Sequence, residues 1–190
     1  MSAKTYSEAD AGAIAAPYAD RTIALVGLMG AGKSTVGRRL ADALGRNFYD
    51  SDSEIEKAAG RSVSDIFATL GEDEFRRGEK AVLKRLLDET PHVLATGGGA
   101  FLAPETRELM SEKAVTVWLN ADLETLWKRV SKRSHRPLLR TPDPRGALSK
   151  LLDERTPIYS MADLTVTSKD GPHSLTVRAI LDALKTWSPQ

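Results

Sequence analysis

The chain has 190 residues, 41% of them hydrophobic, and its 27 basic and 26 acidic side chains give a formal net charge of +1. This length and apolar content suit one α/β domain with a sizeable core, and the balanced charge excludes bulk attraction to nucleic acid or to a membrane surface. The sequence has no cysteine, which excludes disulfides and thiolate metal sites and predicts a cytoplasmic protein.

Residues 1–20 are expected to form a flexible N-terminal tail that precedes a single domain over residues 21–190. The tail carries Lys4, Glu8 and Asp10 among alanines, and it lacks the basic start and apolar core of a secretory signal. No apolar run approaches the roughly 20 residues that a bilayer-spanning helix needs. The sequence therefore predicts a protein that is neither exported nor inserted in a membrane.

Short apolar runs alternate with helical patterns from residue 22 onward. The predicted strands are 22–26, 47–50, 92–96, 114–119 and 163–167. The predicted helices are 33–44, 53–59, 63–69, 73–89, 104–112, 122–132, 145–156 and 174–187, with Asp122 and Ser174 as N-caps. Strands separated by helices predict a parallel sheet covered on both faces, with ligands beyond the carboxyl ends of its strands.

The segment Gly27–Ser34 follows the first predicted strand and has the form glycine, four residues, Gly-Lys-Ser. In the order strand, glycine-rich turn and helix, this motif is typical of polyphosphate binding, because backbone N–H groups and the helix N-terminus point at the ligand. Lys33 is expected to reach the β- and γ-phosphates, and the Ser34 hydroxyl to occupy a Mg²⁺ coordination position. The sequence thus predicts a nucleoside-triphosphate site.

Two carboxylates, Asp50 and Asp52, follow the second predicted strand. Asp50 suits Mg²⁺, directly or through water, and Asp52 suits an acceptor hydroxyl that it orients or deprotonates. Capping of the next helix by Ser51 or Asp52 is an alternative that does not exclude these roles. The chain lacks the aspartate at the end of an apolar strand that many phosphate-loop enzymes use for magnesium, and Asp50 is the natural substitute.

Three consecutive glycines, Gly97, Gly98 and Gly99, follow the third predicted strand. They bring bare backbone close to another group and can donate N–H groups to a ligand, although a plain tight turn is the alternative. Earlier in the chain, Arg76 and Glu79 lie three residues apart on one helix face. Glu79 is expected to fix the guanidinium so that Arg76 binds a substrate carboxylate, with a surface ion pair as the alternative.

The segment from Arg129 to Arg145 is rich in arginine and lysine and contains one acid, Asp143. Such a segment suits a lid, placed at about 132–145, that closes over polyphosphate and neutralises charge in the transition state; a solvated basic loop is the alternative. Arg155 follows as either a second carboxylate anchor or a partner of the acids beside it.

These motifs together resemble shikimate kinase, a phosphate-loop family of the nucleoside-monophosphate-kinase type. The resemblance runs over about residues 22–187. It rests on these segments in order: the phosphate loop Gly27–Arg38, Asp50-Ser51-Asp52, Gly71-Glu72 with Phe75-Arg76 and Glu79, Gly97-Gly98-Gly99, Arg136-Pro137-Leu138, and Arg155-Thr156-Pro157-Ile158-Tyr159. It implies a three-layer α/β/α fold with a five-stranded parallel sheet, a substrate-binding helical region and a lid.

The implied reaction transfers the γ-phosphoryl group of ATP to the 3-hydroxyl of shikimate, with Mg²⁺ as cofactor, in a monomeric enzyme. The residues implied for ATP are Gly30, Ala31, Gly32, Lys33, Ser34, Thr35, Arg129 against the adenine, and Arg136 at the transferring phosphate. Those implied for shikimate are Asp52, Arg76, Gly97, Gly98, Gly99 and Arg155. Ser34 and Asp50 are implied for the metal, and Lys33, Asp52 and Arg136 for catalysis.

Two alternatives compete with this interpretation. Another small-metabolite kinase of the same fold, resembling gluconate kinase, would share the phosphate loop and a basic lid but not the triple glycine or the Arg155–Tyr159 motif. A non-catalytic ATP-binding module would be expected to lack a magnesium ligand or an acceptor residue. The segment Thr167–Pro172 matches the family's adenine loop only loosely, so no base contact is assigned there.

Overall fold

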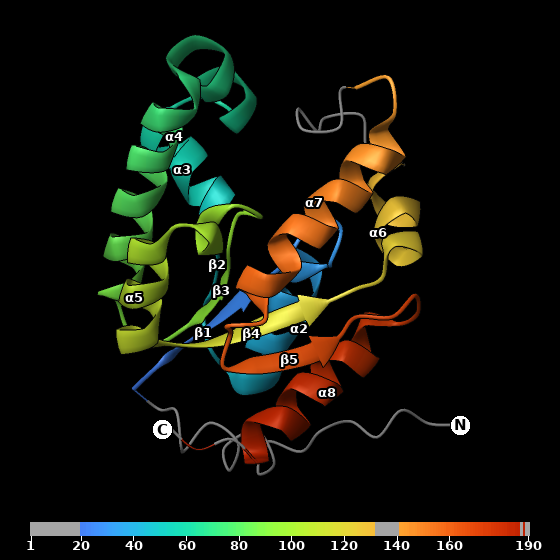
Figure 1. Cartoon of the computed structure of the whole chain (residues 1–190). Coiled ribbons are helices and arrows are strands. Elements are labelled where there is room, and N and C mark those ends of the chain that lie inside the picture. Colours follow the sequence, from blue (N-terminus) through green and yellow to red (C-terminus); the bar gives the residue numbers. More distant parts are fainter. Residues whose placement is uncertain (1–19, 132–140, 187, 189–190) are drawn as a thin grey trace.

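The computed structural model describes residues 20–131, 141–186 and 188, and its strands form one parallel sheet in the order β2-β3-β1-β4-β5 (Figure 1). The strands are β1 (Thr22–Val26), β2 (Phe48–Asp50), β3 (Val93–Ala95), β4 (Ala114–Asn120) and β5 (Leu164–Thr167). Each predicted strand is present, with ends within one residue of the prediction. The five-stranded parallel sheet that the family resemblance implied is confirmed.

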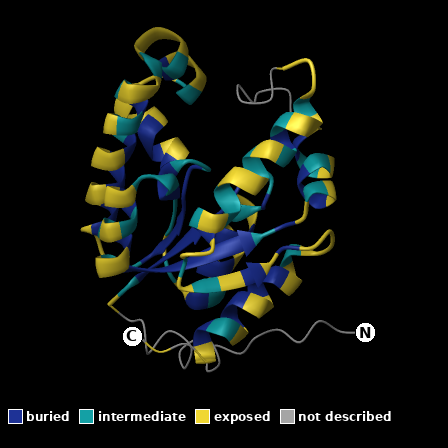
Figure 2. Cartoon of the chain, in the orientation of Figure 1, coloured by how far each residue is buried: buried dark blue, intermediate teal, exposed yellow. Residues whose placement is uncertain are grey.

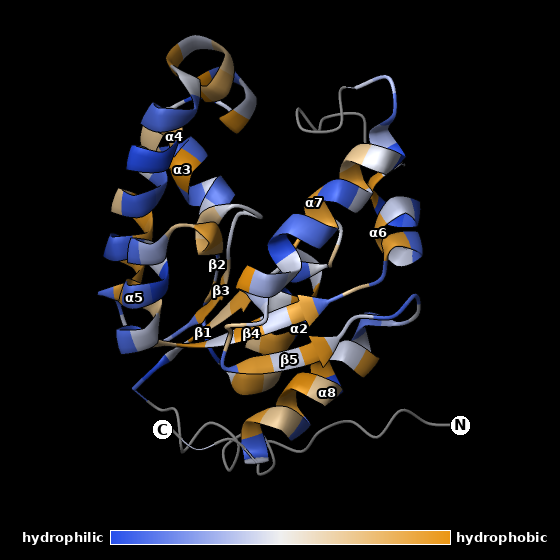
Figure 3. Cartoon of the chain, in the orientation of Figure 1, coloured by the Kyte–Doolittle hydropathy of each residue, from blue (hydrophilic) through white to orange (hydrophobic). Residues whose placement is uncertain are grey.

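Burial along each strand follows its position in the sheet. All five residues of the central strand β1 are buried, whereas the three residues of the edge strand β2 are half-buried (Figure 2). A strand covered on both faces needs apolar side chains on both, which explains the unbroken run Ile23–Val26. In Figure 3 the apolar residues gather on the strands and on the inner sides of the helices.

Helices cover both faces of the sheet (Figure 1). One face carries α2 (Lys33–Leu44) and α8 (His173–Thr186), which pack against each other; the other carries α4 (Val63–Leu87), α5 (Pro104–Lys113) and α7 (Pro144–Tyr159). Three shorter elements complete the described chain: α3 (Ser51–Ala59), the 3₁₀ helix η2 (Ala100–Leu102) and α6 (Leu123–Val130). The chain crosses the sheet in one direction from β1 to β2 and in the other from β2 through β3 and β4 to β5. Because the crossovers are right-handed, this reversal places α2 on one face and the later crossover helices on the other.

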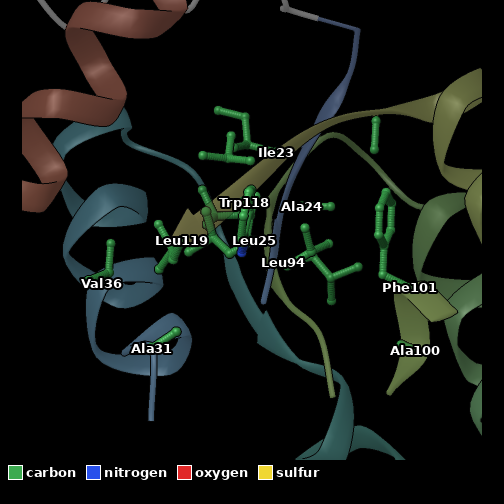
Figure 4. Close-up of a cluster of buried hydrophobic side chains, with 14 of the residues drawn as sticks. Ile23, Ala24, Leu25, Ala31, Val36, Leu94, Ala100, Phe101, Trp118 and Leu119 are labelled. Atoms are coloured by element: carbon green, nitrogen blue, oxygen red, sulfur yellow. The ribbon is translucent and has the colours of Figure 1, made fainter. Parts of the chain in front are cut away.

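The core lies between the sheet and these helices. Figure 4 shows Leu25 and Leu94 from neighbouring strands, Val36 from α2 and Phe101 from η2, all at most 3% exposed. Because interiors are packed as densely as organic crystals, this cluster fixes where each strand ends. The loops that follow β1, β2 and β3 are therefore held at one edge of the sheet.

The helices differ from the sequence prediction at several places, including the start of α3 at Ser51, two residues early, and the end of α7 at Tyr159, three residues late. The two helices predicted at 63–69 and 73–89 form one helical run with a kink at Gly71, whose φ of 82° and ψ of 175° are not helical. Helix α7 begins at Pro144, so the last two residues of the predicted 132–145 lid are helical. Asp122 caps α6 as predicted, but the Ser174 cap is wrong, because α8 already begins at His173.

Among the described residues, no helix combines the length and the apolar character that crossing a bilayer requires.

Candidate active site

The phosphate loop joins the end of β1 to the start of α2. Gly30 and Gly32 have φ of 86° and 99°, conformations that side chains rarely tolerate, so both positions require glycine. Gly32 is the N-cap of α2, and as a glycine it offers no side-chain acceptor of its own to the first N–H groups of the helix. This is the arrangement that binds anions at a helix N-terminus.

The Lys33 side chain folds back over this loop. Its ammonium group donates to the carbonyls of Gly27 at 2.6 Å and Leu28 at 3.1 Å. These bonds hold a positive charge above the loop, where polyphosphate oxygens would compete for the same donors.

A cavity of about 500 Å³ opens beside the phosphate loop. Its lining comes from five segments that are distant in the sequence: the phosphate loop with the start of α2, the junction of β2 and α3, the loop after β3, α6, and the loop between β5 and α8 with the first residue of α8. The residues are Met29, Gly30, Gly32, Lys33, Ser34, Thr35, Asp50, Asp52, Thr96, Gly98, Lys128, Arg129, Asp170 and His173. Ala31 does not line the cavity with its side chain, which is fully buried.

Asp50 connects the phosphate loop to α3. Its Oδ2 accepts the Ser34 hydroxyl at 2.6 Å, and its Oδ1 accepts the N–H of Asp52 at 3.1 Å as the N-cap of α3. The cap therefore falls on Asp50 and not on Ser51 or Asp52. Hydroxyl and carboxylate oxygens side by side are the ligands that Mg²⁺ takes from proteins, with water and phosphate completing its shell, so Ser34 and Asp50 fit this ion.

The described residues hold no group of three or more histidine, aspartate or glutamate side chains arranged to bind a metal by themselves. A magnesium ion that is shared with nucleotide phosphates needs only one or two protein ligands. The Ser34–Asp50 pair is therefore the metal-binding candidate in the described part of the chain.

The glycines after β3 allow three charged side chains to approach the backbone. A Cβ on Gly97 would lie 2.7 Å from Asp52 Oδ1 and 2.9 Å from Glu79 Oε1, and one on Gly99 would lie 2.5 Å from a nitrogen of Arg76. Neither Gly97 nor Gly99 has a positive φ, so the need for glycine comes from these contacts and not from backbone conformation. The expected close approach is present, and the approaching groups are these three side chains.

Arg76 and Glu79 form the expected pair. The guanidinium donates to Glu79 Oε2 at 2.6 Å and to Glu72 Oε1 at 3.1 Å. Glu79 is 3% exposed, and burial raises the pKa of its carboxyl despite the hydrogen bond and charge of Arg76. Its other oxygen, Oε1, is buried, has no hydrogen-bond partner among the residues that the structure describes, and lies beside Gly97.

Arg155 reaches the same turn from α7. Its Nη1 lies 3.4 Å from the carbonyl of Gly98, which also accepts the Tyr159 hydroxyl. Arg76 on α4 and Arg155 on α7 thus bracket Gly98 and Gly99 from two different helices. Neither arginine lines the cavity described above, so the turn is the link between them and the phosphate loop.

Arg129 is fixed by acceptors from both sides of the cavity. Its guanidinium donates to the carbonyls of Gly30 and Ala31 at 3.1 and 3.2 Å, to Ser168 Oγ at 3.1 Å and to the carbonyl of Lys169 at 2.7 Å. A guanidinium held by four acceptors is a rigid, flat surface, which suits the expected contact with a planar base.

Sequence reasoning missed several residues that the structure brings to the site. Ser51, Tyr159 and Ser168 hydrogen-bond the loops described above, and His173 lines the cavity with a buried Nδ1 that has no partner among the described residues. Burial and the nearby charges of Arg129 and Arg39 lower the pKa of His173. Ser51 and Tyr159 stand in motifs that carry the family resemblance, but their contacts, like those of Ser168, join segments far apart in the chain and were not predicted.

Arg136, expected at the transferring phosphate, lies outside the described residues, as do residues 132–140 of the predicted lid. Arg145, at the end of that segment, pairs with Glu124 of α6.

Comparison with known proteins shows matches over most of the chain. The model of the shikimate kinase family matches residues 29–185. A shikimate kinase from Caulobacter vibrioides is 58% identical over 170 residues, covering 90% of this chain and 85% of the relative. One from Rhodopseudomonas palustris is 52% identical, covering 92% and 86%.

Solved structures agree with the sequence matches. A shikimate kinase from Acinetobacter baumannii in complex with shikimate superimposes with a TM-score of 0.84 at 39% identity, covering 89% of this chain and 95% of that one. A gluconokinase from Sinorhizobium meliloti reaches a TM-score of 0.59 at 20% identity, which reflects a shared fold alone.

Proposed function

Because this chain belongs to the shikimate kinase family, it transfers the γ-phosphoryl group of ATP to the 3-hydroxyl of shikimate, and we propose that it does so in the cavity beside the phosphate loop. The product, shikimate 3-phosphate, lies on the route to the aromatic amino acids. The observation that carries this proposal is that Asp52 and the Gly97–Gly99 turn adjoin the phosphate loop, so that donor and acceptor meet there.

The phosphate loop and Lys33 hold the polyphosphate of ATP, and the Arg129 guanidinium lies against its base. Ser34 and Asp50 would hold Mg²⁺, which neutralises charge on the phosphates when it is bound. Phosphoryl transfer needs positioning and charge neutralisation more than covalent help from the protein, which fits a site made of backbone donors and few reactive groups.

The acceptor lies across the turn after β3. Arg76 and Arg155 bind the shikimate carboxylate, together with the backbone of Gly98. Asp52 accepts the proton of the shikimate 3-hydroxyl while the oxygen of that hydroxyl forms a bond to the γ-phosphorus. The bond from the γ-phosphorus to the β,γ-bridging oxygen breaks at the same time, and ADP is released. From its sequence motif alone, Arg136 is proposed to neutralise charge on the transferring phosphoryl group.

A substrate panel tests both the acceptor and its orientation. ADP release is measured with shikimate, with its methyl ester, with gluconate, with nucleoside monophosphates and without acceptor. We expect turnover with shikimate, little with the ester, and none above the blank with the others, because the ester lacks the charge that the two arginines bind. Equal use of ester and acid would contradict the carboxylate site, and turnover with gluconate alone would favour the related kinase.

We further propose that the enzyme works in the cytoplasm as a monomer built of one domain. The absence of cysteine and the single sheet of the described residues support this. Light scattering of the purified protein tests the monomer, because a dimer would double the mass from 20.7 kDa.

A further inference from the structure

The Gly97–Gly99 turn is held from one side by Ser51. This residue begins α3, between Asp50 and Asp52, and is fully buried. Its Oγ accepts the N–H of Gly97 at 2.8 Å. A buried N–H without an acceptor is costly, so this bond keeps the first glycine of the turn against α3 and beside Asp52.

Tyr159 holds the turn from the opposite side. Its hydroxyl donates to the carbonyl of Gly98, and its ring, 1% exposed, stacks on Trp118 of β4 with a centroid separation of 6.2 Å. Trp118 in turn contacts the phosphate loop, where its Cδ1 would lie 3.2 Å from a Cβ on Gly27. Figure 1 shows α3 and α7, which carry Ser51 and Tyr159, on opposite sides of the end of β3.

The two bonds leave a defined pair of donors on the turn. The N–H of Gly97 is used by Ser51, whereas those of Gly98 and Gly99 donate to no residue that the structure describes. The carbonyl of Gly98 and the N–H of Gly99 belong to one planar trans peptide, so the bond from Tyr159 to the carbonyl also fixes the direction of that N–H. Successive N–H groups of this kind bind anions.

We propose that Ser51 and Tyr159 are positioning residues for the acceptor: they clamp the Gly97–Gly99 turn from its two sides so that the N–H groups of Gly98 and Gly99 face the carboxylate between Arg76 and Arg155. This inference rests on the proposed binding of the shikimate carboxylate at this turn. Neither residue touches the reacting atoms, and both act through the backbone of the turn.

Single substitutions of Ser51 and Tyr159 test the clamp. In Ser51→Ala and Tyr159→Phe we expect the KM for shikimate to rise about tenfold each, because each change removes one hydrogen bond to the turn. We expect the KM for ATP to stay within about twofold and kcat to fall less than the KM rises. Tyr159→Phe keeps the ring on Trp118, so it tests the clamp even where Ser51→Ala is poorly folded.

Matched controls remove the same atoms elsewhere. Ser111→Ala deletes an exposed hydroxyl on α5 that bonds its own helix, and Tyr49→Phe deletes a tyrosine hydroxyl on β2, where the ring packs on His92. We expect both to leave the KM for shikimate unchanged. A fall in the melting temperature of Ser51→Ala and Tyr159→Phe with no change in this KM would overturn the clamp and leave only a structural role.

A separate variant distinguishes failure of the clamp from failure of the proposed site. Arg76→Ala removes a guanidinium that would touch the carboxylate, so we expect its KM for shikimate to rise by more than tenfold, and far more than its KM for ATP. If Arg76→Ala has this effect and the clamp variants do not, the clamp is refuted and the carboxylate site stands. If Arg76→Ala also has no effect, the carboxylate lies elsewhere and both proposals fall.

Discussion

The substitution Gly97→Ala tests whether catalysis depends on the position that the Asp52 carboxylate takes beside the Gly97–Gly99 turn. The new Cβ would lie 2.7 Å from Asp52 Oδ1, and ordinary van der Waals contact begins at 3.4 Å, so the carboxylate must move by about 0.7 Å. Glu79 Oε1 is 2.9 Å away on the same side and is buried, which limits how far the backbone can move instead. The φ of Gly97 is compatible with alanine, so the substitution acts through this contact.

Displacement of a catalytic group by about 1 Å is enough to cost on the order of 10²-fold in rate. We therefore expect kcat of Gly97→Ala to fall about 10–100-fold. The KM for ATP should change little, because the three atoms nearest to the new methyl group belong to Asp52 and Glu79 and not to the phosphate loop. The assay is ADP release at saturating ATP with varied shikimate, together with a thermal melt to show that the variant is folded.

Gly78→Ala is the matched control. Gly78 lies in α4, and a Cβ there meets nothing within 4 Å, so alanine should raise the free energy of unfolding by about 0.5–1 kcal/mol and leave the kinetics unchanged. A folded Gly97→Ala enzyme with wild-type kcat would refute the reasoning. It would show that the Asp52 carboxylate can be displaced by the new methyl group without loss of catalysis.

Three further outcomes are expected. Asp52→Asn should lower kcat about 10²–10⁴-fold with ATP binding little changed, and retained turnover would remove Asp52 from the mechanism. Asp50→Asn should raise the Mg²⁺ concentration for half-maximal rate about tenfold or more, whereas an unchanged Mg²⁺ titration would exclude it as a ligand. His92 is fully buried, and burial lowers its pKa from the usual 6.5. As the pH falls below 6.5, this histidine therefore binds a proton in the unfolded chain before it does so in the folded one. The free energy of unfolding should therefore be highest above about pH 6.5 and decline below it, and urea unfolding of His92→Leu between pH 5 and 8 should show a flatter profile.

The sheet and the phosphate loop were predictable because their signals are local. An unbroken apolar run marks β1, which is buried on both faces, and the glycine spacing marks a turn that needs positive φ at Gly30 and Gly32. The cap at Ser174 failed for an equally local reason: the helix already starts one residue earlier, directly after Pro172, whose carbonyl accepts the N–H of Leu175.

The rest of the site depends on contacts between distant segments. The triple glycine predicted that another group lies close to the backbone of the turn. It did not predict which group, since Asp52 and Glu79 belong to other helices. Ser51 and Tyr159 bond the turn across 46 and 61 residues of sequence, so the local motifs that contain them do not show these contacts. Such contacts can be recognised only in the structure, where the fold brings the distant segments together.

The bond from Ser168 to Ala31 has a consequence for how the protein is made. The Ser168 hydroxyl donates to the Ala31 carbonyl at 2.9 Å, across 137 positions of sequence, and the same hydroxyl accepts from Arg129. The nucleotide site thus begins in a segment that is synthesised 137 residues before the residue that completes it. A nascent chain stalled before residue 168 would carry the glycine-rich motif without its completed pocket, so ATP binding reports that synthesis has reached β5 and the loop beyond it.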